Sequence, residues 1–301
     1  MSTDVGLEVG ERRRGWDVAA VVAALRVRQW TKNLLVFAGI VFAAKLDDPV
    51  RWLEAIACFV AYCAASSAAY LVNDVRDMEA DRAHPVKRLR PIASGELAPR
   101  VALWLAVALG LLSLLAVIPL GPASVALLAL FAALQAAYTL SLKHVVLVDV
   151  FAIAALFVIR ASAGAVAVDV PISPWLYLCT GLLALFIALG KRRAELVLVE
   201  SRETPGRRVL DGYTLPLIDQ LVTIVASATI AAYALYTFTA RDSSTLMATI
   251  PFVVFGIFRY LLLLHRHEAG EEPEQVLLRD APILAAVVLW GVTCAAILAL
   301  D

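Results

Sequence analysis

The segment Asn73-Asp74-Val75-Arg76-Asp77-Met78-Glu79-Ala80-Asp81-Arg82 directly follows an apolar stretch at residues 52–71. On one helix that turns ~100° per residue, its asparagine and its aspartates fall in a single quadrant. Carboxylates at that density repel one another. A hard cation such as magnesium relieves the repulsion, because it binds carboxylate oxygens and completes its shell with water and phosphate oxygens. We therefore interpret Asn73, Asp74, Asp77 and Asp81 as metal ligands beside a diphosphate. The alternative is a solvated helix end.

The composition predicts an integral membrane protein. Apolar residues make up 61% of the chain, against about 45–50% in soluble domains, and the mean hydropathy is +0.82. A membrane-spanning helix needs ~20 apolar residues. Nine segments approach that length: residues 34–46 (extended back to 29), 52–71, 101–118, 123–142, 147–168, 175–189, 217–239, 246–264 and 281–300. The sequence thus predicts an all-α integral membrane fold with nine transmembrane helices.

The distribution of basic residues predicts the orientation in the membrane. Of the 26 lysines and arginines, 21 lie in the N-terminal tail and in the even-numbered connections, and 3 lie on the alternate side. Cytoplasmic loops carry the excess of positive charge. We therefore expect a cytoplasmic N-terminus and an external C-terminus in the plasma membrane. Residues 1–28 form the expected cytoplasmic tail and residues 29–301 the nine-helix catalytic domain.

A cationic loop follows the acidic segment. Arg82 precedes His84 and Pro85, which stop the helix, and Lys87, Arg88 and Arg90 come next. Acidic residues that bind a metal, followed by basic residues that bind phosphate, suit a metal-bound diphosphate. The alternative for this loop is simple anchoring of the protein to the inner membrane surface.

Further polar residues lie at the ends of the later spans or inside them. The fourth connection carries Tyr138 and Lys143, and Asp149 begins the fifth span. Arg160 lies three turns into that span, where a charge is costly without a counter-charge or a polar cavity. It indicates either a pocket that reaches into the bundle or a structural hydrogen bond between helices. Lys191, at the end of the sixth span, either binds phosphate or pairs with Glu195 one turn later.

The order of these motifs resembles the UbiA superfamily of membrane prenyltransferases. The specific match is Asn73-Asp-x-x-Asp77-x-x-x-Asp81-Arg-x-His84-Pro-x-Lys-Arg-x-Arg90-Pro-Ile-Ala-x-Gly95. It extends to residues 28–33, 138–149, 160–164, 190–196 and 270–280. Aromatic prenyltransferases of the superfamily carry a second Asp-x-x-x-Asp cluster after the fourth span, which this sequence lacks. The resemblance is therefore to the phosphoribosyltransferase branch, and it implies a UbiA-type helical bundle.

The resemblance also implies a reaction. A magnesium-dependent enzyme of this branch transfers the 5-phosphoribosyl group from phosphoribosyl pyrophosphate to a polyprenyl (decaprenyl) phosphate, a step toward cell-wall arabinan. The catalytic residues expected here are Asp74, Asp77, Asp81 and Lys143. Substrate contacts are expected from Lys32, Asn73, Arg82, Lys87, Arg88, Arg90, Tyr138, Asp149, Arg160 and Lys191.

Two other functions stay open from the sequence. One is an aromatic prenyltransferase that uses a polyprenyl diphosphate, and the other is a membrane transporter with Arg160 inside the membrane. The expected partners are the two phosphorylated substrates and the lipid bilayer, with no nucleic acid. The sequence leaves open whether the chain forms a homo-oligomer.

Overall fold

The computed structural model describes residues 18–42, 48–84, 86–171, 173–202, 208–239, 244–266 and 279–300, and every regular element in these ranges is a helix. In chain order the elements, with 3₁₀ helices written η, are α1 (Val18–Leu25), η1 (Val27–Phe37), α2 (Ala38–Phe42), α3 (Pro49–Arg76), α4 (Met78–Ala83), η2 (Lys87–Leu89), α5 (Pro91–Ser94), α6 (Pro99–Val117), η3 (Ile118–Leu120), α7 (Pro122–Leu140), η4 (Leu142–His144), α8 (Val148–Ala167), α9 (Pro174–Arg202), η5 (Arg208–Gly212), α10 (Leu215–Thr239), η6 (Thr245–Thr249), α11 (Ile250–His265) and α13 (Ala281–Leu300). The predicted all-α class is confirmed for these ranges. Residues 1–17 of the predicted tail and the matched elements at 270–278 lie outside them.

Proline starts several of the long helices. Pro49, Pro99, Pro122 and Pro174 are the first residues of α3, α6, α7 and α9. N–H groups in the first turn of a helix have no acceptor within the helix, so proline loses no hydrogen bond there. Its fixed φ also suits a helix. At α3 the carboxylate of Asp48 adds a cap, because it accepts a hydrogen bond of 2.9 Å from the Val50 amide. The local sequence therefore sets where these helices begin.

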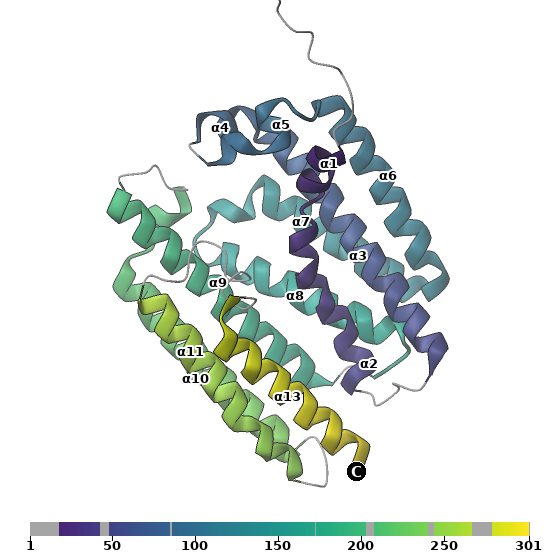
Figure 1. Cartoon of the computed structure of the whole chain (residues 1–301), viewed down its shortest axis with the longest axis vertical. Coiled ribbons are helices and arrows are strands. Elements are labelled where there is room, and N and C mark those ends of the chain that lie inside the picture. Colours follow the sequence, from purple (N-terminus) through teal and green to yellow (C-terminus); the bar gives the residue numbers. More distant parts are fainter. Residues whose placement is uncertain are drawn as a thin grey trace, which may run out of the picture.

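Helix α8 lies at the centre of the bundle (Figure 1). It packs against η1, α2, α3, α7 and α9. In the most apolar window of α8, 67% of the residues are buried, against 17% in α7. Two apolar cores meet on this helix. Val150 belongs to the core that α8 shares with α9, η5, α10, α11 and α13, and Ile159 belongs to the core that it shares with η1, α3, α6 and α7.

The first predicted span is a broken helix that packs very closely on α8. Instead of one continuous α-helix, the chain forms η1 and then α2, and residues 43–47 lie outside the described ranges. A Cβ atom on Gly164 would lie 1.8 Å from the carbonyl oxygen of Val36, and one on Gly39 would lie 2.7 Å from Cα of Ala165. Two glycines thus let the backbones meet, as small residues do between membrane helices.

We predict that Gly164→Ala destabilises the protein, because the new methyl group would overlap the Val36 carbonyl. Overpacking of this kind costs about 1–3 kcal/mol of unfolding free energy, or more where backbone must move. Thermal unfolding in detergent measures the effect. Gly110→Ala in α6 is the matched control, since a Cβ there meets no atom within 4 Å. Equal melting temperatures for the two variants would contradict the close approach.

Six helices of the described residues are long and apolar enough to cross a membrane: Pro49–Arg76, Pro99–Leu120, Pro122–Leu140, Val148–Ala167, Leu215–Thr239 and Thr245–His265. Large apolar side chains cover their outer faces, among them Trp104, which is 75% exposed. Such a surface suits lipid rather than water. The chain is a multi-pass membrane protein. The number of nine crossings, the sidedness of the termini and the division at residue 29 stay predictions.

Candidate active site

The acidic segment bends at its middle aspartate. Asp77 ends α3 and precedes α4. The helical hydrogen bonds nevertheless continue through the bend, because the Asp77 amide donates to the Asn73 carbonyl at 2.9 Å and the Asp81 amide donates to the Asp77 carbonyl at 2.8 Å. The side chains of Asp74 and Asp81 are 4% and 6% exposed, and that of Asp77 is 31% exposed. The bend therefore leaves one accessible carboxylate beside two buried ones.

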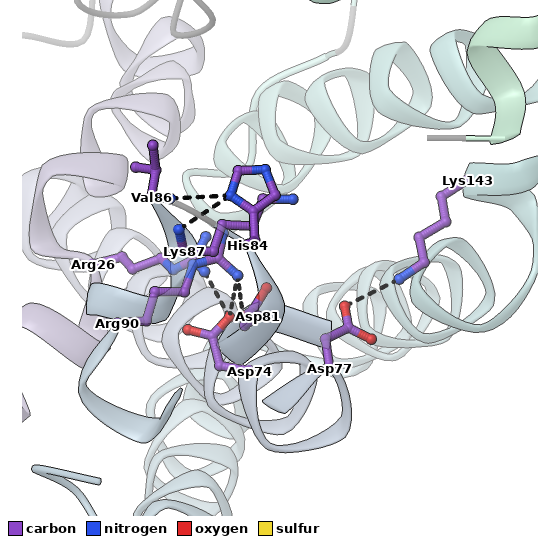
Figure 2. Close-up of polar contacts among 9 residues, drawn as sticks. All are labelled: Arg26, Asp74, Asp77, Asp81, His84, Val86, Lys87, Arg90 and Lys143. Carbon is purple, nitrogen blue, oxygen red and sulfur yellow. Dashed lines mark hydrogen bonds and ion pairs between the residues drawn. The ribbon is translucent and has the colours of Figure 1, made fainter. Parts of the chain in front are cut away.

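Cations from three other segments neutralise these carboxylates (Figure 2). Arg90 Nη1 lies 3.2 Å from Asp74 Oδ1 and 2.6 Å from Asp81 Oδ2. Arg26 Nη2 lies 2.6 Å from the same oxygen of Asp74. Asp77 turns toward Lys143, whose Nζ lies 3.3 Å from Asp77 Oδ2.

The repulsion expected among these carboxylates is therefore relieved by cations of the protein itself. Helical periodicity gave the azimuths of the aspartates, but it gave no sign of cations that arrive from elsewhere in the chain. Among the described residues, no three histidine, cysteine or acidic side chains are grouped closely enough to hold a metal ion. Asn73 is half-buried on the same segment.

The donor set nevertheless fits a divalent cation. A single nitrogen of Arg90 contacts both Asp74 and Asp81, so their oxygens already converge on one position that carries positive charge. Carboxylate oxygens are the ligands that magnesium prefers in proteins. Asp74, Asp77 and Asp81 would hold such an ion, which would compete with Arg26, Arg90 and Lys143 for these carboxylates.

The loop after the aspartates is internally braced. Arg82 pairs with Glu79 at 2.8 Å and donates to the Ala93 carbonyl at 3.2 Å, so it connects α4 to α5. His84 Nδ1 accepts from the amides of Val86 and Lys87. Lys87 is half-buried and Arg88 is exposed, while Pro85 lies outside the described residues. The loop thus presents Arg88 to solvent and uses Arg82 mainly to hold its own shape.

Asp149 belongs to a buried network. Its two oxygens accept from Arg192 Nε at 2.6 Å and from the Tyr213 hydroxyl at 2.8 Å, and the residue has no exposed surface. Arg192 also contacts Glu195 and donates to the Tyr138 hydroxyl at 3.2 Å. Both oxygens of Asp149 thus accept from side chains of the protein, so the structure gives this residue a positioning contact. Its predicted contact with a substrate stays a prediction.

The same network fastens the fourth connection to the sixth. Leu147 has a φ of +68°, which is unfavourable for leucine, and its amide donates to the Tyr213 hydroxyl at 2.8 Å. A Cβ on Gly212 would lie 2.3 Å from Val146 Cγ2, so the two connections touch directly. Burial raises the pKa of Tyr213 to about 12. Its hydroxyl therefore keeps its proton and donates to Asp149 at neutral pH.

We predict that Tyr213→Phe lowers the free energy of unfolding by about 1–3 kcal/mol, because one oxygen of the buried Asp149 carboxylate loses its hydrogen bond and the Leu147 amide loses its acceptor. Thermal or denaturant unfolding in detergent measures this change. Tyr177→Phe is the control, since Tyr177 is 41% exposed. If both variants unfold alike, the Tyr213 hydroxyl does not hold the two connections together.

Arg160 lies inside the bundle, and its hydrogen bonds join it to residues outside the acidic segment. Its Nε donates to Asn33 Oδ1 at 2.7 Å and its Nη1 to the Leu156 carbonyl at 3.0 Å. The guanidinium also stacks over the rings of Phe131 and Phe157, at 4.8 and 5.3 Å from their centroids. These contacts favour the structural alternative. Arg160 thus holds η1 against α8, and its contact with a substrate stays a prediction.

The remaining predicted residues are half-buried. Lys32 lies on η1, Tyr138 on α7 and Lys191 on α9. Sequence reasoning missed three residues that the structure brings into this region: Arg26, Arg192 and Tyr213. Arg26 was counted only as a charge that sets orientation, and Arg192 was passed over beside Lys191. Nothing in the local sequence of Tyr213 indicated its role.

Comparison with known proteins identifies the family. The model of the UbiA prenyltransferase family matches residues 34–279. The chain belongs to this family. It is therefore a membrane enzyme of the UbiA type, and the predicted resemblance is confirmed.

Two relatives and one solved structure illustrate the likeness. The chain is 39% identical to the decaprenyl-phosphate phosphoribosyltransferase of Mycobacterium tuberculosis, over 94% of this chain and 95% of that one. It is 37% identical to the enzyme of the same name from Mycolicibacterium smegmatis, over 91% of this chain and 90% of that one. A UbiA homologue from Archaeoglobus fulgidus, solved with GPP and Mg²⁺, superposes with a TM-score of 0.71 at 16% identity, over 93% of this chain and 99% of that one. At that identity the superposition shows the shared UbiA fold alone.

Proposed function

We propose that this chain is a magnesium-dependent pentosyltransferase that moves the 5-phosphoribosyl group of phosphoribosyl pyrophosphate onto a polyprenyl phosphate. The bond from ribose C1 to the diphosphate breaks, a bond from C1 to a phosphate oxygen of the lipid forms, and pyrophosphate leaves. The observation that carries the proposal is the 39% identity, over nearly the full length of both chains, to a protein named decaprenyl-phosphate phosphoribosyltransferase. Decaprenyl phosphate is accordingly the proposed acceptor.

The acidic segment is the proposed donor site. Asp74, Asp77 and Asp81, with Asn73, would hold magnesium on the diphosphate. When bound, the metal ion neutralises the charge that develops on the leaving pyrophosphate. Arg90 already lies between two of these carboxylates, and Lys87 and Arg88 are on the same loop. Their side chains can therefore donate to diphosphate oxygens next to the acidic residues.

The fourth connection is the proposed site for the sugar. Lys143 reaches the accessible carboxylate of Asp77, and the Tyr138 hydroxyl is fixed by Arg192. The contact of Lys143 with Asp77 supports a cation beside the donor site. We assign Lys143 to phosphate binding and catalysis, and Tyr138 to orientation of the ribose. Lys32 and Lys191 are candidates for the 5-phosphate or the lipid phosphate.

The acceptor needs no strong base. A phosphate monoester is already anionic at neutral pH, so holding it in line with C1 can supply much of the rate. The lipid-facing helices suit a long apolar chain next to such a headgroup. The positive charge on one set of connections supports a cytoplasmic active site in the plasma membrane. A role in making the arabinose donor of cell-wall polysaccharides follows from the same family resemblance.

Transfer of radiolabel tests the reaction. The purified protein is incubated in detergent with phosphoribosyl pyrophosphate labelled in its ribose, decaprenyl phosphate and Mg²⁺, and the lipid is then extracted into organic solvent. We expect label in the organic phase, and we expect EDTA to abolish it and added Mg²⁺ to restore it. Prenylation of an aromatic acid, or passage of a substrate into proteoliposomes without chemical change, together with unlabelled lipid, would contradict the proposal.

We predict that Asp77→Asn lowers turnover by about 10²–10³-fold, the size expected when one group that stabilises developing charge is lost. Asp77 is 31% exposed, so its ion pair with Lys143 contributes at most about 1 kcal/mol to stability. A folded but inactive variant is therefore expected. Activity and thermal unfolding are measured side by side. Glu96→Gln, an exposed residue on the same connection, should keep full activity.

A mild loss of turnover in Asp77→Asn, similar to that in Glu96→Gln, would assign the accessible aspartate to the surface rather than to the reaction.

A further inference from the structure

Arg26 lies at the joint between α1 and η1 in an unusual backbone conformation. Its φ and ψ are 52° and 49°, the left-handed region that costs a residue with a side chain about 1–2 kcal/mol. Its amide donates to the Ala23 carbonyl and its carbonyl accepts from the Gln29 amide, so the turn is tight on both sides. This geometry directs the side chain onto α3. There Nη2 lies 2.6 Å from Asp74 Oδ1, and the guanidinium stacks 4.9 Å from the ring centroid of Tyr70.

The charges around Asp74 and Asp81 cancel. Two carboxylates face two guanidiniums, and one oxygen of Asp74 accepts from both Arg26 and Arg90 (Figure 2). Both carboxylates are nearly inaccessible, and a buried charge is stable only when it is paired. The protein thus carries its own cations at the place where a metal ion would bind. A divalent cation must displace at least one of them to reach Asp74.

Arg26 is better suited to leave than Arg90. Arg90 contacts two of the aspartates and belongs to the loop that immediately follows them, whereas Arg26 contacts one aspartate and comes from a separate helix joint. The side chains of Arg26 and Arg90 are 26% and 28% exposed, so exposure does not distinguish them and the difference lies in the number of their contacts. The ring of Tyr70 contacts the guanidinium of Arg26 in addition to the ion pair with Asp74. The planar guanidinium edge matches two phosphate oxygens as well as it matches a carboxylate.

We infer that Arg26 is an exchangeable counter-cation. It neutralises Asp74 before the donor binds, and it moves to the diphosphate when a metal-bound donor takes over that carboxylate. The inference rests on the proposed donor site and adds to it a residue that binds substrate only after leaving the acidic segment. One consequence is that the metal ion binds weakly by itself and tightly together with the diphosphate. Only the diphosphate gives the displaced Arg26 a new partner.

Metal binding without any donor separates this role from a structural one. Mn²⁺ binding to the full chain in detergent is followed by the electron paramagnetic resonance signal of the free ion. Arg26→Gln removes the competing cation, so the affinity for Mn²⁺ alone should rise about fivefold or more. The affinity for phosphoribosyl pyrophosphate with Mn²⁺ should fall about tenfold, because one charged hydrogen bond to the diphosphate is lost. The two affinities are thus expected to change in opposite directions.

Two further variants complete the test. Arg26→Lys keeps the charge but loses the planar pair of donors, so its affinity for Mn²⁺ should stay close to that of the natural protein while donor affinity falls. Arg259→Gln is the matched control, since Arg259 pairs with Asp280 at 2.9 Å outside the site, and it should alter neither affinity. Thermal unfolding confirms that each variant is folded. If Arg26→Gln does not fold, Arg26→Lys provides the test: its affinity for Mn²⁺ should be unchanged and its affinity for the donor should be lower.

The inference is wrong if Arg26→Gln leaves the affinity for Mn²⁺ alone unchanged or lowers it, as a purely structural brace would, or if Arg26→Lys keeps full donor affinity. The proposed function fails on a different observation, the absence of labelled lipid in the transfer assay with the natural protein. The Mn²⁺ measurement contains no donor, so the two failures cannot be confused.

Discussion

Neutralisation of buried carboxylates is the constraint on which this structure depends. Asp74, Asp81 and Asp149 are all nearly inaccessible, and each accepts from an arginine. A buried carboxylate without a partner would cost several kcal/mol. The arginines come from the α1–η1 joint, from the loop before α5 and from α9. Satisfying these three charges therefore holds the polar ends of distant helices in one arrangement.

Apolar packing provides the rigid frame for those ion pairs. Helix α8 takes part in both apolar cores, and Asp149 lies at its first turn. The close approach of Gly164 to Val36 and the contact of Arg160 with Asn33 fix η1 along the same helix. Arg26 directly precedes η1. The position of Arg26 over Asp74 thus depends on how tightly η1 and α8 pack deep in the bundle.

The sequence predicted what depends on local pattern. Apolar segments gave most of the long helices, and the spacing of Asn73, Asp77 and Asp81 gave successive turns of a helix. The break of the first span into η1 and α2 was not predicted, nor was the close approach there of Val36 to Gly164, two residues that are far apart in the chain. The same holds for Asp149, whose burial against Arg192 and Tyr213 is a property of the packed molecule. Periodicity predicts the face of a helix on which a side chain lies, but it does not predict the distant residue with which that side chain pairs.

The arginines near the acidic segment also show why charge counting cannot separate orientation from chemistry. Arg26 and Arg90 both belong to the excess of basic residues that predicts which connections face the cytoplasm. In the structure the same two side chains contact Asp74, with Arg90 contacting Asp81 as well. A site that holds its own cations can remain neutral without ligand and still offer donors to a diphosphate. For such a protein, the residues that set the topology and the residues that meet the substrate are partly the same.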